Sequence, residues 1–182
     1  MPLTQLDPNA ALVIIDLQKG ITGLPTVHPM AGVLHNAAEL ARAFRKRNLP
    51  VVIVNVIGRA PGRTDTTFKF APPPDWADLA PELDAQPTDH LVSKQRVGAF
   101  LGTDLDAYLR SRNVTQIVLA GVSTSSGVES TARSAYDLGY HVVFASDAMT
   151  DLADEMHRHS IERAFPKMGE VDTTSAILAK LT

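Results

Sequence analysis

Asp16 is the first residue whose type and position suggest chemistry. It ends a run of apolar residues in the stretch VIIDLQKG. Ligands of open α/β sheets bind outside the carboxyl ends of the strands, so an acid there would face a pocket. Apolar neighbours raise the pKa of a carboxyl group by desolvation, which favours general acid or base catalysis. An aspartate that caps the following loop fits equally well, and position alone leaves both interpretations open.

Lys94, in the stretch LVSKQRVGAF, lies where a further strand is expected to end. A lysine there could lower the pKa of a nearby acid or bind a substrate anion. For an isolated lysine, a solvated charge at a strand terminus is the simpler interpretation. Arg96 could fill the same role, and the positions of Lys94 and Arg96 in the sequence do not show which of them does.

The segment GVSTSSGVESTARSAYDLGY, which begins at Gly121, leads from a strand into a helix. Backbone N–H groups at such a turn could stabilise an oxyanion beside a nucleophile. Ser125 and Ser126 offer hydroxyls, but the stretch is not a G-x-S-x-G elbow and no Ser–His–Asp order is apparent. Ser123, Thr124 and Ser125 are instead expected to cap the helix.

Metal and thiol chemistry find little support in the sequence. The chain has no cysteine, which excludes disulfides, thiolate metal sites and cysteine nucleophiles. The histidines lack metal-ligand spacing. His157 and His159 are two residues apart, and residues at that separation on a helix do not face each other. We therefore expect neither a metal nor another cofactor.

Short apolar runs rich in Val and Ile indicate the strands that position these residues. They are apolar at successive positions, the pattern of parallel strands covered by helices on both faces. The runs are Ala11–Asp16, Val51–Val56, Gln116–Ala120 and His141–Ala145, and Leu91–Val92 starts another. Helical patterns between them cover Ala31–Asn48, Asp104–Arg112 with Thr103 and Asp106 as a capping box, Ser125–Leu138 and Asp154–Phe165. The alternation predicts an α/β fold, a three-layer α/β/α sandwich with a Rossmann-like, mostly parallel sheet of about six strands.

The length and net charge of the chain indicate which classes of protein it can belong to. The 182 residues fit a single domain, 1–182, and a net charge of −3 argues against nucleic-acid binding. No apolar run approaches the ~20 residues that span a bilayer, and no signal peptide is apparent, so we expect a cytoplasmic protein without membrane contact. The segment Arg59–His90 carries six of the twelve prolines and the single tryptophan, Trp76. Such a long loop predicts a pocket wall or an oligomer contact.

Three blocks, in this order, resemble the isochorismatase-like hydrolase superfamily: ALVIIDLQKG, KQRVGAFLGTDLDAYLR and VLAGVSTSSGVESTARSAYDLGYHVVFASDAMTD. Together they cover nearly the whole chain. Most members use an Asp–Lys–Cys triad, and the resemblance implies Asp16 as the acid and Lys94, rather than Arg96, as the lysine. The cysteine position is Gly127, which excludes hydrolysis through a thioester. The non-proline cis peptide of the family would fall at Val122–Ser123.

The resemblance implies a hydrolase acting on a small molecule. True isochorismatases also lack the cysteine and are thought to protonate a vinyl ether with the Asp before water attacks. This implies non-covalent acid/base catalysis by Asp16 and Lys94, with Gly127 completing the catalytic site. A catalytically inactive small-molecule-binding protein and a serine-assisted amidase are the alternatives.

Departures from the family pattern bear on the substrate. Isochorismatases carry a glutamine near the position of Val56, so isochorismate is not the expected substrate, and Arg59 or Arg63 is available for an anion. The metal-binding branch carries an Asp–His–His cluster where this chain offers His28 alone. Family members form dimers or tetramers, so a homodimer or homotetramer is expected. Substrate contacts are expected from Val122, Ser123, Ser126, Phe100 and Trp76, and variable pocket walls from 21–30 and 68–76.

Overall fold

Six parallel strands form the centre of the protein in a computed structural model, which describes residues 3–65 and 72–181. The strands lie side by side in the order β3-β2-β1-β4-β5-β6. They are β1 (Ala10–Ile15), β2 (Val51–Val56), β3 (His90–Lys94), β4 (Gln116–Val122), β5 (His141–Thr150) and β6 (Glu170–Asp172). The predicted α/β fold with about six strands is thereby confirmed.

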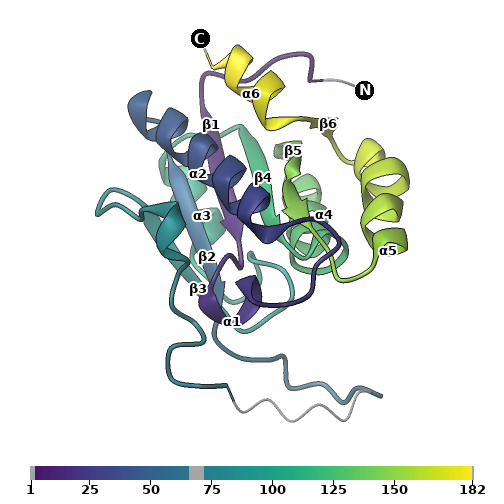
Figure 1. Ribbon diagram of the computed structural model, residues 1–182. Coiled ribbons are helices and arrows are strands. Elements are labelled where there is room, and N and C mark those ends of the chain that lie inside the picture. Colours follow the sequence, from purple (N-terminus) through teal and green to yellow (C-terminus); the bar gives the residue numbers. More distant parts are fainter. Residues whose placement is uncertain (1–2, 66–71, 182) are drawn as a thin grey trace.

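Helices cover both faces of this sheet (Figure 1). The α-helices are α1 (Lys19–Thr22), α2 (Met30–Lys46), α3 (Leu105–Ser111), α4 (Glu129–Asp137), α5 (Asp154–His159) and α6 (Thr174–Lys180), and 3-10 turns occupy Pro81–Leu83 and Phe165–Lys167. Side chains of α2 and α6 join one buried cluster, and those of α3 and α4 join the other. The chain therefore has the three layers that the sequence predicts.

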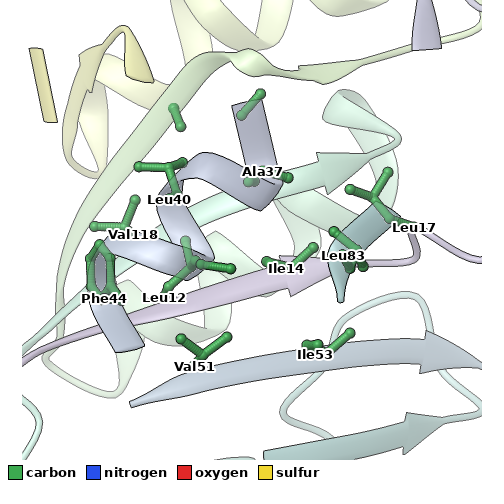
Figure 2. Close-up of a cluster of buried hydrophobic side chains, with 14 of the residues drawn as sticks. Leu12, Ile14, Leu17, Ala37, Leu40, Phe44, Val51, Ile53, Leu83 and Val118 are labelled. Atoms are coloured by element: carbon green, nitrogen blue, oxygen red, sulfur yellow. The ribbon is translucent and has the colours of Figure 1, made fainter. Parts of the chain in front are cut away.

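The central strand β1 shows why its sequence is apolar without interruption. All six of its residues are buried. Leu12 and Ile14 belong to the cluster that includes Phe44 of α2, whereas Val13 and Ile15 belong to the opposite cluster. Figure 2 shows Leu12 and Ile14 within the first of these clusters. Because successive side chains of a strand point to opposite faces, a strand covered on both faces must be apolar at every position.

Three predicted helices differ in detail from the observed ones. The one predicted as Asp154–Phe165 is α-helical up to His159 and continues as a π-helical stretch, Ser160–Ala164. The stretch predicted as Ser125–Leu138 begins with a π-helical turn, Thr124–Val128, before α4. The capping box predicted for α3 does not form, although Thr103 Oγ1 accepts a long hydrogen bond of 3.3 Å from the Leu105 amide. The carboxylate of Asp106 is drawn away because it accepts hydrogen bonds from Tyr140 and Arg110.

The strand order reverses between β1 and β4, because β2 and β3 lie on one side of that pair and β5 and β6 on the other. Open α/β sheets bind ligands at such a switch point, outside the carboxyl ends of the strands. The short helix α1 and the segment that follows β2 lie at this end of the sheet (Figure 1). The fold thus places the ends of β1 and β4 where a ligand site is expected.

The sequence also makes predictions about membrane contact and about the wall of the pocket. Among the described residues, none of the helices combines the length and apolar character needed to cross a bilayer. The predicted pocket wall at 68–76 lies partly outside the described residues, which resume at Pro72.

Candidate active site

Asp16 and Lys94 meet at the carboxyl ends of the strands. Asp16 follows β1 directly, and its backbone is fixed by hydrogen bonds with Val54 and Gln18. Lys94 ends β3, two strands away, so its side chain reaches across the end of β2. Its Nζ lies 2.8 Å from Asp16 Oδ2, and the two side chains are only 2% and 9% exposed. The two residues named from the sequence therefore form a buried ion pair.

Burial dominates the electrostatics of Asp16. Desolvation raises the pKa of its carboxyl group to about 6, while the charge and hydrogen bond of Lys94 act in the opposite direction. Its Oδ1 is buried and has no hydrogen-bond partner among the described residues. A carboxyl group with this pKa can give and regain a proton near neutral pH.

Gly127 lies beside this ion pair in the turn after β4. A Cβ at this position would lie 3.2 Å from Asp16 Oδ2 and 3.0 Å from Ile15 Cγ2. Residue 127 therefore faces the acid directly, and as glycine it presents backbone where a nucleophilic side chain would otherwise stand. The turn begins with a cis peptide bond between Val122 and Ser123.

The side chain of Asp151 fixes this turn, a role that the sequence analysis assigned to the serines. Its Oδ2 accepts a hydrogen bond of 2.7 Å from the Ser125 amide, and Ser123, at the N-cap position, makes no side-chain cap. The Thr124 hydroxyl instead lies 2.8 Å from Nδ1 of the buried His157. The expectation that Ser123, Thr124 and Ser125 cap the helix is therefore wrong, because a carboxylate from the end of β5 occupies that role.

A cavity of about 400 Å³ opens above the ion pair. Of the residues expected at the site, its lining contains Asp16, Lys94, Gly127, Val122, Ser123 and Ser126. The rest of the described lining comes from four segments, at or after α1, β2, β3 and β5, and its members are Ile21, Leu24, Val56, Gly58, Arg59, Ala60, Gly62, Thr64, Gln95, Arg96, Val97 and Leu152. The loop that starts at Arg59 thus forms part of the cavity wall. A pocket wall was one of the two roles predicted for this proline-rich segment, the other being an oligomer contact.

Phe100 and Trp76, also expected to contact substrate, are not among the residues that line this cavity. Phe100 packs against the core layer of α3 and α4, with its ring centroid 5.9 Å from that of Tyr140. The indole of Trp76 lies over Gly20 in α1, where an added Cβ would come within 1.8 Å of it. Both side chains are thus engaged by other elements of the fold. Arg63 is likewise absent from the described lining.

The histidines do not assemble a metal site in the part of the chain that the structure describes. No group of three or more His, Cys, Asp or Glu residues is arranged there to hold an ion. The rings of His28 and His157 pack edge to face with centroids 4.6 Å apart, and burial lowers the pKa of His157. His159 is exposed on the other side of α5.

Sequence reasoning missed several residues that shape the site. Gln18 is fully buried and links Val56 to the backbone of Trp76 through its side-chain amide. Asp151 and Leu152 follow β5 at the same edge of the sheet as Asp16. Their position after a strand was the available signal, because carboxyl ends of parallel strands meet at one edge. The role of Asp151 as a partner of Ser125 depends on a contact between distant segments that spacing does not reveal.

Comparisons with known proteins agree with this fold. A model of the isochorismatase domain matches residues 10–176. The isochorismatase family protein YwoC of Bacillus subtilis is 41% identical over 95% of this chain and 94% of that protein. The ureidoacrylate amidohydrolase RutB of Variovorax paradoxus is 26% identical over 83% of this chain and 72% of that protein.

Among solved structures, an isochorismatase family protein from Burkholderia thailandensis superposes with a TM-score of 0.94. It is 43% identical, and the match covers 97% of each chain. The domain match, the protein from Bacillus subtilis and the structure from Burkholderia thailandensis extend over nearly the whole sequence. The chain therefore belongs to the isochorismatase family of hydrolases.

Proposed function

We propose that this protein hydrolyses a small molecule by non-covalent acid/base catalysis, with Asp16 as the acid and Lys94 as its electrostatic partner. One observation carries the proposal. The carboxyl group that faces residue 127 is buried, is paired with Lys94 at 2.8 Å and has a pKa raised to about 6, and residue 127 has no side chain. The site therefore retains an acid of suitable strength without a nucleophile beside it.

The reaction uses water as the nucleophile. Asp16 gives its proton to the substrate, which makes a neighbouring carbon electron-poor. A water oxygen forms a bond to that carbon, the bond from the carbon to the leaving atom breaks, and a proton from the water returns to the Asp16 carboxylate. The net change is the addition of one water molecule across the cleaved bond, and Asp16 ends in its starting state.

Lys94 and the turn at Gly127 support these steps. The Lys94 ammonium stabilises the carboxylate that remains after proton transfer, because opposite charges at this distance interact strongly in a poorly hydrated site. Its second contact, a hydrogen bond of 3.2 Å to the Arg96 carbonyl, fixes the ammonium in place. The missing side chain at Gly127 leaves room beside Asp16 Oδ2 for a water molecule or for part of the substrate.

Serine-assisted hydrolysis receives less support from the geometry. Ser126 lines the cavity, but within the described residues neither its hydroxyl nor that of Ser125 forms a hydrogen bond to a histidine. The histidine that does contact this turn, His157, bonds to Thr124. A serine nucleophile requires an adjacent base to activate it.

The family relationship also supports proposals on assembly and location. We propose that residues 1–182 form one domain, that the protein is a homodimer or homotetramer without a cofactor, and that it acts in the cytoplasm. Size-exclusion chromatography coupled to light scattering tests the assembly, and a monomer at micromolar concentration would contradict it.

A substrate screen tests the catalytic proposal. Enol ethers, esters, amides and ureido compounds are incubated with the wild-type protein and with Asp16→Asn, while intact-protein mass spectra are recorded during turnover. We expect wild-type turnover of at least one class, no covalent adduct, and a loss of about 100-fold or more in Asp16→Asn. Retained activity in Asp16→Asn, an adduct on a serine, or ligand-induced thermal stabilisation without turnover of any compound would overturn the proposal.

A further inference from the structure

The charges that line the cavity are unevenly distributed. Asp16 is the one acid in the described lining, and it is already paired with Lys94. The same lining contains two arginines, Arg59 and Arg96. Arg59 has interactions of its own, so Arg96 is the cation of the described wall whose partner is in question.

Arg96 is the better placed of these two cations. Its backbone is fixed next to the ion pair, because its carbonyl oxygen accepts the hydrogen bond from Lys94 Nζ. Its side chain is half-buried, whereas Arg59 is exposed. The guanidinium of Arg96 forms no hydrogen bond or ion pair with any of the residues that the structure describes. A partly buried arginine at the cavity wall with no partner for its guanidinium is suited to bind an anion supplied by a ligand.

The mouth of the cavity has a different character. Leu24, Val97 and Leu152 line it, and each is unusually exposed for a large apolar side chain, at 40%, 52% and 55%. They come from three separate loops, after α1, β3 and β5. Apolar residues that gather at the entrance of a cavity mark a surface that a ligand covers. The ligand should therefore have an apolar body as well as a charged group.

We propose that the substrate is a small carboxylic acid with an apolar body, whose carboxylate is held by Arg96 while its reacting bond lies at Asp16. The planar guanidinium fork matches the two oxygens of a carboxylate. This inference rests on the proposed function for the location of the reacting bond, but the binding preference is independent of turnover.

The test compares matched pairs of probes by isothermal titration calorimetry. Each pair is a carboxylate and its primary amide on the same apolar body, namely 3-phenylpropionate, cyclohexylacetate and 2-naphthylacetate with the corresponding amides. The proteins are wild type, Arg96→Gln, Asp16→Asn and Arg163→Gln, in which Arg163 is an exposed arginine outside the cavity lining.

We expect at least one carboxylate to bind wild type about tenfold or more tightly than its amide. This preference should disappear in Arg96→Gln and persist in Arg163→Gln and in Asp16→Asn. Carboxylates that bind no better than their amides in all three pairs would overturn the inference, as would an unchanged preference in Arg96→Gln. If Asp16→Asn keeps both turnover and the preference, the catalytic proposal fails while the carboxylate inference stands.

Discussion

The carboxylate of Asp151 joins the end of β5 to the turn after β4 through a hydrogen bond of 2.7 Å from the Ser125 amide. Its second oxygen accepts from the Leu152 amide at 2.8 Å, and its carbonyl accepts from Val27. One residue thus ties together three loops that surround the cavity. The turn that carries Gly127 is held by a partner 26 positions away in the chain and not by its own serines.

Removal of this carboxylate should destabilise the protein. Asp151→Ala leaves a partly buried amide at the start of a helical segment without its acceptor, at a cost of about 1–2 kcal/mol in the free energy of unfolding. Urea denaturation monitored by circular dichroism measures the loss. Asp137→Ala, at an exposed position late in α4, serves as the control and should change little. Equal stability of the two variants would contradict the role assigned to Asp151.

Gly121 is expected to be intolerant of any side chain. It adopts a φ of +122°, and a Cβ there would lie 2.0 Å from the carbonyl oxygen of Ile15. Gly121→Ala must therefore separate β1 from β4 or distort the backbone, and should cost about 3 kcal/mol or more. Gly32→Ala, in α2 with open space around it, should instead stabilise by about 0.5–1 kcal/mol. Thermal unfolding of both variants checks the contrast.

A thiol at position 127 should introduce covalent chemistry. Gly127→Cys places its sulfur next to Asp16 and Lys94, and we expect faster hydrolysis of p-nitrophenyl acetate with an acetylated protein detectable by mass spectrometry. Gly23→Cys, where nothing lies near the added Cβ, is the matched control and should show neither. Addition of Asp16→Asn to Gly127→Cys should remove the gain. If a cysteine at 127 reacts with p-nitrophenyl acetate no faster than a cysteine at 23, the Asp16–Lys94 pair does not activate position 127.

Loss of Lys94 should make stability depend strongly on pH. Lys94→Met removes the charge that lowers the pKa of Asp16, so the folded-state pKa rises further above the ordinary value of 3.8. A carboxyl group with a raised folded-state pKa supports stability at low pH, and that contribution is lost as pH rises through the folded-state pKa. Lys94→Met should therefore be much less stable at pH 8 than at pH 5, relative to wild type. Lys19→Met, which breaks an exposed ion pair with Asp78, should show little such dependence.

The layered fold was predictable because its signals are local. β1 is apolar at every position and β2 and β4 carry long apolar runs, VVIV and IVLA, because both faces of these strands are covered, and that pattern is visible in the sequence. The edge strand β6 is three residues long, too short to leave a comparable run. For the site, the sequence placed Asp16 and Lys94 at strand ends, but only the family resemblance separated Lys94 from Arg96.

Contacts between loops that lie far apart in the chain could not be predicted from the spacing of residues in the sequence. Phe100 and Trp76 were expected to contact substrate, yet their side chains pack against Tyr140 and Gly20. Leu24, within the predicted wall 21–30, and Leu152, directly after β5, both line the cavity, but their positions in the sequence do not show which side chains of these segments face it. Which side of a loop faces a cavity depends on how the surrounding helices and strands position that loop, and this is a property of the folded chain.

The pH dependence of kcat/KM for the first substrate found tests the acid role of Asp16 most directly. The free enzyme must carry the proton on Asp16, whose pKa lies at about 6, so kcat/KM should be constant below that pH and fall about tenfold per pH unit above it. The ¹³C chemical shift of the Asp16 carboxyl carbon should titrate over the same range. A kcat/KM that rises with pH through this range, following ionisation of Asp16, would contradict proton donation as the first step.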